Sequence, residues 1–435
     1  MRRNELERLL LRCEGLAVLR GVLDSQPARR FLRVLELLAD ERADAAGMAG
    51  ACGRLWRELA IERSGLLPDA WRSHLVERLL EDENPFSLAA ERGRAAPEAA
   101  GQVRTELRTL RRLFELSTGG LLGLAEGRFP ELAGLWEPLE TRDLPDGSPR
   151  REFAAKLAAT EDWGERVEDL ARYFATYGAG APGRHRAFSW SGGELLPVRY
   201  PDPVRLGELY GYEREREPLV RNTERFLAGL PAHHALVYGL PGTGKSATVK
   251  AIANEYAERG LRLVELAKGE LGELPRLLEV LRERGLRFIV FVDDLSFEEH
   301  EVEYKALKAL LEGSVSEPPQ NVRLYATSNR RNIVRERFSE RDEADDVHLR
   351  DSMQEKLSLA ARFGLRITFL APDQKRYLEI VSGLVRERGI EIPEEELRER
   401  ALRWDVWSAG RSGRTARQFV DELEAELSGQ IRRLW

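Results

Sequence analysis

Lysine, cysteine and methionine are scarce in this chain. Of its 435 residues, two are cysteine and three are methionine, and only eight of the 68 basic residues are lysine. The two cysteines, Cys13 and Cys52, are too few for a disulfide framework, and no spacing of Cys and His resembles a zinc site. Both are therefore expected to be small buried hydrophobic residues.

Long apolar runs are also absent. No segment approaches the ~20 consecutive apolar residues of a membrane-spanning helix, and the first leucines of the chain alternate with charges, unlike a signal peptide. The net charge is −6, so no overall basic character attracts the chain to nucleic acid or to a membrane. With 42% hydrophobic and 33% charged residues, the composition predicts a globular cytoplasmic protein that is large enough for two or three cores.

The chain divides into segments of different pattern. Residues 1–176 repeat apolar positions with the 3.6-residue period of helices and predict an all-helical N-terminal domain. Residues 177–203 are rich in glycine and proline and predict a linker, with the domain boundary near residue 185. Residues 204–371 alternate short apolar strands with helices, which favours an α/β core with a parallel sheet covered on both faces. Residues 372–435 contain helical patterns only and predict a small helical lid.

One glycine-rich loop carries the clearest chemical signal. The segment GLPGTGKS ends at Ser246 and lies between a predicted strand and a predicted helix. Its glycines let backbone N–H groups approach phosphate oxygens, which side chains would block. In a chain that uses arginine almost everywhere, Lys245 indicates a site for a compact ammonium group that reaches the β- and γ-phosphates, against the alternative of an ordinary glycine-rich turn. The predicted nucleotide-binding residues of this loop are Gly239, Pro241, Gly242, Thr243, Gly244, Lys245, Ser246 and Ala247.

Two acids and a polar strand end complete the predicted site. The run FIVFVDD delivers Asp293 and Asp294 to the end of a buried strand, where ligands bind in such sheets. We expect Ser246 and Asp293 to hold Mg²⁺, and Asp294 to orient or deprotonate the attacking water. The alternative is a pair of acids that only cap a turn. The run YATSN ends the next strand with three polar residues that could lie beside the γ-phosphate: Thr327, Ser328 and Asn329.

Together with the helical lid, the order of these features resembles the AAA+ ATPases. The chain is similar in particular to a bacterial ATP-binding family called domain of unknown function 815. The resemblance covers about residues 206–427, and the segments that carry it are NTERFLAGLPAHHALVYGLPGTGKS, FVDDLSFEE, YKALKALLEGS, YATSNRRN, QEKLSLAARFGL and PDQKRYLEIV. It implies a core sheet with the strand order 5-1-4-3-2, ATP and Mg²⁺ as ligands, and a homo-oligomer.

The resemblance also implies roles for single residues. Asn329 would be the sensor that contacts the γ-phosphate or the attacking water. Arg362 would be an arginine finger that reaches the nucleotide of a neighbouring subunit. Arg414, with Arg417 as the alternative, would be a second sensor on the lid, although any of these arginines could instead be a solvated side chain. The segment that would lie against adenine through its backbone is Tyr210, Gly211 and Tyr212.

Two departures from the AAA+ pattern bear on mechanism. Asp294 stands where most AAA+ proteins place glutamate, and a water-positioning group set back by about an ångström can cost ~100-fold in rate, so hydrolysis is expected to be slow. The loop around Lys268–Gly269 lacks the aromatic residue with which protein-threading members grip a chain. Other features are expected to be structural: His233 and His234 in a turn, Trp404 and Trp407 in the lid, and the charged run 335–351 on the surface.

The sequence therefore favours an oligomeric, Mg²⁺-dependent ATPase that remodels or recruits a protein partner, with the helical N-terminal domain as the adaptor. Two alternatives remain open. One is a nucleic-acid loader or initiator-type ATPase, although no basic stripe with interleaved aromatic residues supports it. The other is a nucleotide-gated scaffold with negligible turnover. The identity of the partner is not indicated by any motif.

Overall fold

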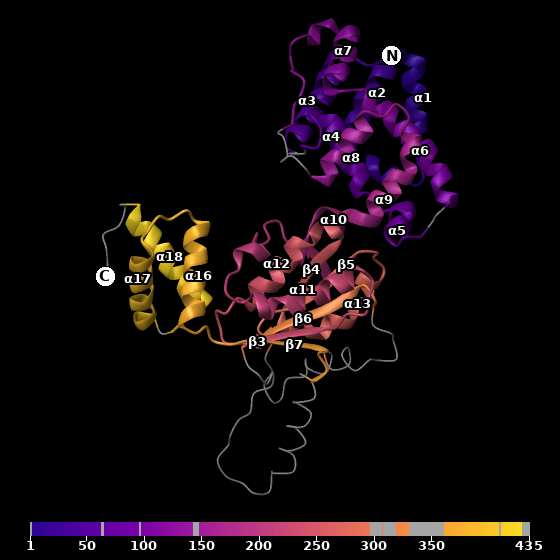
Figure 1. Ribbon diagram of the computed structural model, residues 1–435. Coiled ribbons are helices and arrows are strands. Elements are labelled where there is room, and N and C mark those ends of the chain that lie inside the picture. Colours follow the sequence, from indigo (N-terminus) through magenta and orange to yellow (C-terminus); the bar gives the residue numbers. More distant parts are fainter. Residues whose placement is uncertain are drawn as a thin grey trace. The chain divides into compact units, whose positions relative to one another are not determined.

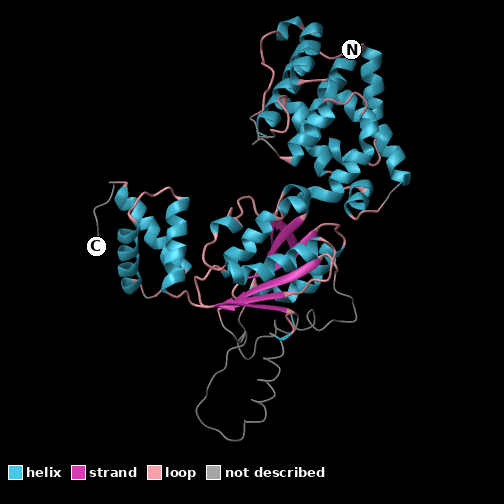
Figure 2. Ribbon diagram, viewed as in Figure 1, coloured by secondary structure: helices cyan, strands magenta, loops and turns pink. Residues whose placement is uncertain are grey.

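The protein consists of two compact units, Met1–Arg184 and His185–Trp435, in a computed structural model (Figure 1). The first unit is helical, and the second combines a sheet with helices (Figure 2). The charged run 335–351 lies outside the described residues. The structure describes residues 2–61, 65–94, 97–141, 148–295, 307, 319–329, 361–408 and 410–428.

The first unit is built from helices whose apolar stripes meet in one core. Its helices are α1 (Arg3–Glu14), α2 (Gln26–Ala39), α3 (Ala45–Ile61), α4 (Ala70–Glu81), α5 (Pro85–Glu91), α6 (Pro97–Glu115), α7 (Thr118–Arg128), α8 (Pro149–Ala158), α9 (Val167–Tyr177) and α10 (Gly180–Arg184). On α1, Leu6, Leu9 and Cys13 are buried, which is the stripe that the 3.6-residue period predicts. Helix starts coincide with polar caps: the side chain of Ser25 accepts a hydrogen bond from the first turn of α2, and that of Asp69 from the first turn of α4.

Both cysteines are buried and free within this helical core. Burial raises the pKa of the Cys52 thiol to about 11 and that of the Cys13 thiol to about 12. Neither thiol ionises appreciably at neutral pH, so neither is a ready nucleophile. The prediction of two small buried hydrophobic residues is confirmed.

A mostly parallel sheet forms the centre of the second unit. Within the described residues its strands are β1 (Ala187–Ser191), β2 (Glu194–Pro197), β3 (Ala235–Gly239), β4 (Leu261–Leu266), β5 (Arg287–Val292), β6 (Val322–Ser328) and β7 (Leu365–Phe369). They lie in the order β2-β1-β4-β5-β6-β3-β7, and every pair is parallel except β1 with β2. When β3 is counted as the first strand, β7 to β4 follow the order 5-1-4-3-2. The predicted α/β fold and its AAA+ strand order are therefore confirmed.

The prediction of a linker over residues 177–203 is wrong for residues 187–197, which add a hairpin to the edge of this sheet. β1 pairs in parallel with β4, and β2 pairs antiparallel with β1. Phe188 and Trp190 are buried on one face of β1, and Gly192 and Gly193 form the turn with φ angles of 60° and 83°. The high glycine and proline content of the segment concealed this short alternation of apolar and polar residues.

Helices cover both faces of the sheet. The described helices of the core are α11 (Glu213–Leu227), α12 (Lys245–Glu255) and α13 (Leu274–Arg282), and those of the lid are α16 (Gln374–Glu387), α17 (Glu394–Trp407) and α18 (Gly413–Leu427). On β3, Ala235 and Val237 share a core with α11, α12 and the lid, whereas Leu236 shares a core with α13. Because successive residues of β3 point into two different cores, its continuously apolar sequence is explained.

The two lid tryptophans differ in environment. The Trp404 ring is buried and lies 6.0 Å from the ring of Phe419 on α18, as expected for a packing residue. Trp407 is 70% exposed although its ring approaches that of Trp404 at 5.5 Å. The expectation that both tryptophans pack inside the lid is therefore wrong for Trp407, which is the last residue of α17.

His234 connects two strands rather than merely forming a turn. Its Nδ1 accepts a hydrogen bond from the backbone N–H of Leu324 on β6, at 2.9 Å. Burial lowers the pKa of the His234 imidazole to about 4, and the positive charge of Arg323 adds to the effect. The ring is therefore neutral at pH 7, with its lone pair used to hold β6.

This pKa predicts a loss of stability on acidification. Because an unfolded histidine titrates near pH 6.5, the unfolded chain binds more protons than the folded chain between about pH 6.5 and pH 4, and stability falls as the pH falls through that window. The contribution of His234 is up to about 3 kcal/mol at pH 4. Thermal melts from pH 7 to pH 4 should show a smaller loss for His234→Asn, whose amide oxygen can still accept the Leu324 hydrogen bond. His233→Asn, at an exposed neighbouring position, is the control and should behave like the parent; equal slopes in all three proteins would contradict the assignment.

Candidate nucleotide-binding site

The phosphate loop joins the end of β3 to the start of α12. Gly239 has a φ of 146°, and a Cβ at this position would lie 1.9 Å from the carbonyl oxygen of Phe369 on β7. Gly244 precedes α12 in the left-handed conformation, with a φ of 89°. Only glycine meets these two requirements without strain. The loop therefore leads into the N-terminus of α12 with a backbone that an anion can approach closely.

Lys245 lies in the pocket above this loop with 5% of its surface exposed. Its Nζ donates hydrogen bonds to two carbonyl oxygens of the loop, at 2.9 and 2.8 Å, and to Oδ1 of Asn329 at 2.9 Å. Burial lowers the pKa of the Lys245 ammonium, while the carboxylates of Asp293 and Asp294 raise it. The surrounding acceptors and acids thus compensate a buried positive charge.

The two acids follow β5 at the same edge of the sheet as the phosphate loop. Oδ1 of Asp293 accepts hydrogen bonds from the hydroxyl of Ser246, at 2.6 Å, and from the hydroxyl of Thr327 at the end of β6. Oδ1 of Asp294 accepts a hydrogen bond from Nδ2 of Asn329 at 2.7 Å. The amide of Asn329 therefore joins this acid to the loop lysine, and the structure brings together the residues that the sequence predicted from three separate segments.

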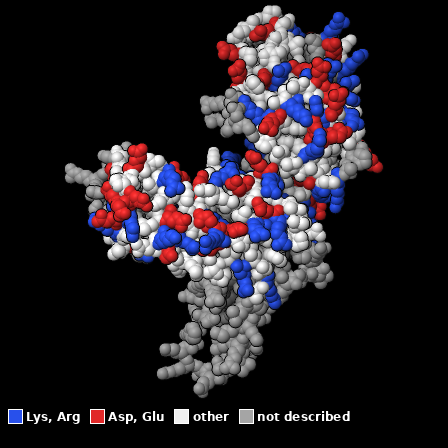
Figure 3. Space-filling view, in the orientation of Figure 1, with Lys and Arg blue, Asp and Glu red and all other residues white. Residues whose placement is uncertain are grey.

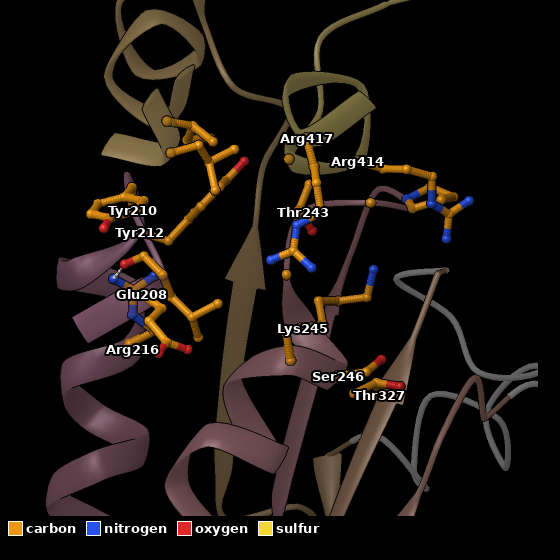
Figure 4. A pocket seen from close by; sticks show the side chains of 18 of the residues that line it. Glu208, Tyr210, Tyr212, Arg216, Thr243, Lys245, Ser246, Thr327, Arg414 and Arg417 are labelled. Atoms are coloured by element: carbon orange, nitrogen blue, oxygen red, sulfur yellow. Dashed lines mark hydrogen bonds between the residues drawn. The ribbon is translucent and has the colours of Figure 1, made fainter. Parts of the chain in front are cut away.

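The oxygen atoms of Ser246 and Asp293 fit Mg²⁺. This cation prefers oxygen ligands and commonly binds through one or two protein groups together with substrate phosphates and water. Within the described ranges, no three His, Cys, Asp or Glu side chains gather where they could hold a metal ion by themselves. The donor set is therefore suited to a cation that binds together with a nucleotide. Ser246 and Thr327 lie next to each other beneath Lys245 (Figure 4).

The lid contributes two arginines to the same pocket. Arg414 and Arg417 both line it, and they enter from α18 on the side opposite to Ser246 (Figure 4). The backbone N–H of Arg414 donates to the carbonyl oxygen of Gly242 at 3.2 Å, so the start of α18 rests directly on the phosphate loop. A Cβ on Gly242 would lie 3.0 Å from Oγ of Ser412, the residue that caps α18. Both candidates for the lid sensor therefore line the pocket.

Of the segment predicted to contact adenine, Tyr210 and Tyr212 line the other end of the pocket, whereas Gly211 between them does not line it. The ring of Tyr210 lies against Gly383 on α16, where an added Cβ would be 2.3 Å from the ring. Gly211 has a φ of 86°, and the hydroxyl of Tyr212 donates to the carbonyl oxygen of Leu370 at 2.6 Å. These contacts hold the segment between the core and the lid, beside a cavity of about 560 Å³.

Several lining residues were not predicted from the sequence. Gln418 and Asp421 follow Arg414 and Arg417 on one face of α18, so helical spacing alone could have identified them. Arg216 on α11 offered no such signal among the many arginines of the chain. It is buried, and it donates to the carbonyl oxygen of Leu209 and to Glu213. The remaining lining residues that were missed include Glu208, Ile380 and Leu384.

Arg362 lies away from this pocket. It is half-buried and precedes β7, in which Leu365 pairs with Ala235 and Phe369 pairs with Gly239. Because the phosphate loop follows Gly239, Arg362 lies toward the opposite end of the sheet, just before the edge strand. It does not line the pocket of its own chain, and any action on a nucleotide would have to be in another subunit.

The loop around Lys268 begins a short 3-10 helix, Lys268–Glu273, after β4. Leu271 within it is fully buried, so part of the segment belongs to the core.

No helix in the described part of the chain is both long enough and apolar enough to cross a membrane.

A family model, described as a protein of unknown function (DUF815), matches residues 183–427 of this chain. The core is also similar to two archaeal proteasome-activating nucleotidases. That of Methanocella arvoryzae is 31% identical over 121 residues, which is 24% of this chain and 29% of the nucleotidase. That of Sulfurisphaera tokodaii is 31% identical over 156 residues, which is 32% of this chain and 40% of the nucleotidase. The chain thus spans less than half the length of the curated relatives it matches.

A shorter match links the chain to a eukaryotic protein, the 26S proteasome regulatory subunit 4 homolog of Schizosaccharomyces pombe. It is 40% identical over 70 residues, or 15% of this chain and 16% of that protein. Among solved structures, the RuvB Holliday junction branch migration motor of Thermotoga maritima aligns with a TM-score of 0.37 and 19% identity, covering 54% of this chain and 68% of that one.

Proposed function

This chain belongs to the DUF815 family and has an AAA+ fold, and from that premise we propose that it binds ATP with Mg²⁺ and hydrolyses it slowly. We further propose that the cycle serves to remodel or recruit a protein partner. The single observation that supports the chemistry best is the convergence of the loop lysine, the acid pair and Asn329 in one pocket, with lid arginines opposite.

Each group has a definite task in this proposal. Lys245 neutralises the β- and γ-phosphates, and Ser246 with Asp293 holds Mg²⁺, which supplies charge compensation on the phosphates. Asp294 takes up or directs the proton of the attacking water. Asn329, already within hydrogen-bonding distance of Asp294, orients that water or contacts the γ-phosphate.

In this proposal the lid couples the state of the bound nucleotide to a movement of the protein. Helix α18 contacts the phosphate loop at Gly242 and carries Arg414 and Arg417 into the pocket. Because these side chains are positively charged, a bound triphosphate would attract α18 more strongly than a diphosphate would. The orientation of the lid would then depend on the state of the nucleotide. We propose that this dependence, in an oligomer, is what acts on the partner.

The partner is proposed to be a protein that binds the helical first unit. The nucleotidases to which the core is similar are named for activating the proteasome, which supports a protein partner. On the face shown in Figure 3, basic and acidic side chains are interspersed over the described surface, and no basic stripe that would favour a nucleic acid is seen there. Salt-dependent binding to DNA or RNA would instead favour a loader, and ATP binding without turnover would favour a scaffold.

Replacing Asp294 by asparagine tests the hydrolytic part of the proposal. The amide cannot accept a proton but tolerates the same backbone conformation, so ATP binding should persist while turnover falls about 100-fold or more. Binding by fluorescent nucleotide titration and release of phosphate are the two measurements. Glu265→Gln, which removes an exposed acid from β4, is the matched control and should retain turnover. Full activity of the Asp294 variant would place water activation elsewhere, and Glu298 and Glu299, outside the described residues, would be tested next.

A further inference from the structure

The backbone at Asp294 is unusual. Among the described residues other than glycine, Asp294 alone has a positive φ, at 49°. Aspartate and asparagine tolerate this left-handed conformation better than longer side chains do, because their short polar groups bond locally. A residue held in a rarely populated conformation at a functional site indicates that surrounding contacts enforce it.

Thr327 supplies those contacts. At the end of β6, with 1% of its surface exposed, it bonds to three consecutive residues. Its hydroxyl accepts from the backbone N–H of Asp294 at 3.0 Å and donates to Oδ1 of Asp293. Its carbonyl oxygen accepts from the backbone N–H of Leu295 at 2.7 Å. The backbone N–H of Asp294 also donates to Oδ1 of Asp293 at 3.1 Å. Thr327 therefore holds the turn that follows β5 both directly and through the carboxylate of Asp293.

The left-handed turn decides where the Asp294 carboxylate lies. Asp294 is exposed and lines the nucleotide pocket, whereas the next residue, Leu295, returns to the core and is completely buried. These two neighbouring side chains therefore lie in different environments, and the Asp294 carboxylate accepts a hydrogen bond from the Asn329 amide at 2.7 Å. A longer acid in the same backbone conformation would extend past this position as well as straining the turn.

We propose that Thr327 is a positioning residue of the ATPase: its hydroxyl holds Asp294 in the left-handed turn that aims the carboxylate, and this turn is what selects aspartate instead of glutamate at position 294. The proposal rests on the proposed hydrolysis of ATP. In this proposal the shorter side chain of Asp294 is not a defect, because aspartate fits the left-handed backbone better than glutamate does. Replacing Asp294 by glutamate should therefore lower the rate of ATP hydrolysis.

The kinetic test compares Thr327→Val, Thr327→Ser and Asp294→Glu at saturating Mg²⁺. Valine has the shape of threonine without its hydroxyl, so kcat should fall about 100-fold, as for a reacting group displaced by an ångström, with little change in KM. Serine keeps the hydroxyl and should recover most of the turnover. Asp294→Glu should also lose turnover. Thr223→Val is the control. It removes a buried hydroxyl that bonds to Tyr325 and does not line the pocket, so it should lower the melting temperature but not kcat.

A second measurement is independent of turnover. Glycine adopts the left-handed conformation freely and alanine does not, so Asp294→Gly should melt at a higher temperature than Asp294→Ala. Equal or reversed melting temperatures, a fully active Thr327→Val, or an Asp294→Glu faster than the parent would each overturn the proposal. If the parent protein never releases phosphate, the proposed ATPase activity and the catalytic role of the turn are both refuted. The comparison of melting temperatures would then decide alone whether the turn favours aspartate at position 294.

Discussion

Replacing Lys245 by alanine is expected to abolish ATP binding. Lys245 is the only lysine in the phosphate loop. Its ammonium group is buried and donates hydrogen bonds to oxygen acceptors, and a nucleotide phosphate can take the place of some of these acceptors. A hydrogen bond to a charged group contributes about 1.5–3 kcal/mol. Two such bonds to the β- and γ-phosphates would correspond to about 3–6 kcal/mol, or roughly a 10²- to 10⁴-fold loss of affinity.

Two measurements check this result. Nucleotide titration gives the affinity directly, and the shift of the melting temperature on addition of ATP and Mg²⁺ reports it by linkage. The parent should be stabilised by ATP and the Lys245→Ala variant should not. Lys250→Ala, farther along the same helix, is the matched control and should bind ATP normally. Lys245→Arg should also fail, because a planar guanidinium does not fit a cradle built for a compact ammonium. Unchanged affinity in both variants at Lys245 would refute the site.

Replacing Arg362 by alanine is expected to leave ATP binding intact and to remove turnover. Arg362 precedes the edge strand β7, lies toward the end of the sheet opposite to the phosphate loop, and does not line the pocket of its own chain. A guanidinium supplied by a neighbouring subunit would stabilise charge developing on the γ-phosphoryl group. In related phosphoryl transfers this effect is about 10³–10⁵ in rate.

The control for this variant is Arg366→Ala, which removes an exposed arginine from β7 itself and should remain active. Specific activity of the parent should rise with protein concentration, and ATP should shift the protein to a larger species in size-exclusion chromatography, because a nucleotide at a subunit boundary favours assembly. A monomer whose activity is independent of concentration would contradict a role for Arg362 in a neighbouring subunit.

Mixing two inactive variants gives the most direct evidence. Lys245→Ala subunits lack a working pocket but retain Arg362, whereas Arg362→Ala subunits retain the pocket. In a mixed oligomer, the first variant can supply the arginine to the second, and some activity should return. Activity that stays at the level of the separate variants at every mixing ratio would argue for a nucleotide-gated scaffold.

Features set by local backbone requirements could be predicted from the sequence. The glycines at 239 and 244 must adopt positive φ angles, and their spacing around Lys245 therefore identifies the phosphate loop. The apolar run that ends at Asp293 must be a buried strand, because it offers no polar face to solvent. These local features were sufficient to reveal the resemblance to AAA+ proteins, and the strand order was predicted from that resemblance.

Features set by contacts between distant segments required the tertiary structure. The left-handed conformation of Asp294 depends on Thr327, which is 33 residues later in the chain. The packing of Tyr210 on Gly383 and the entry of both Arg414 and Arg417 into one pocket depend on how the lid meets the core. An arginine in this chain carries no signal by itself, since 60 of the 68 basic residues are arginine. Only the folded arrangement distinguishes the few arginines that line the pocket, because burial and proximity are properties of the folded core and not of any single segment.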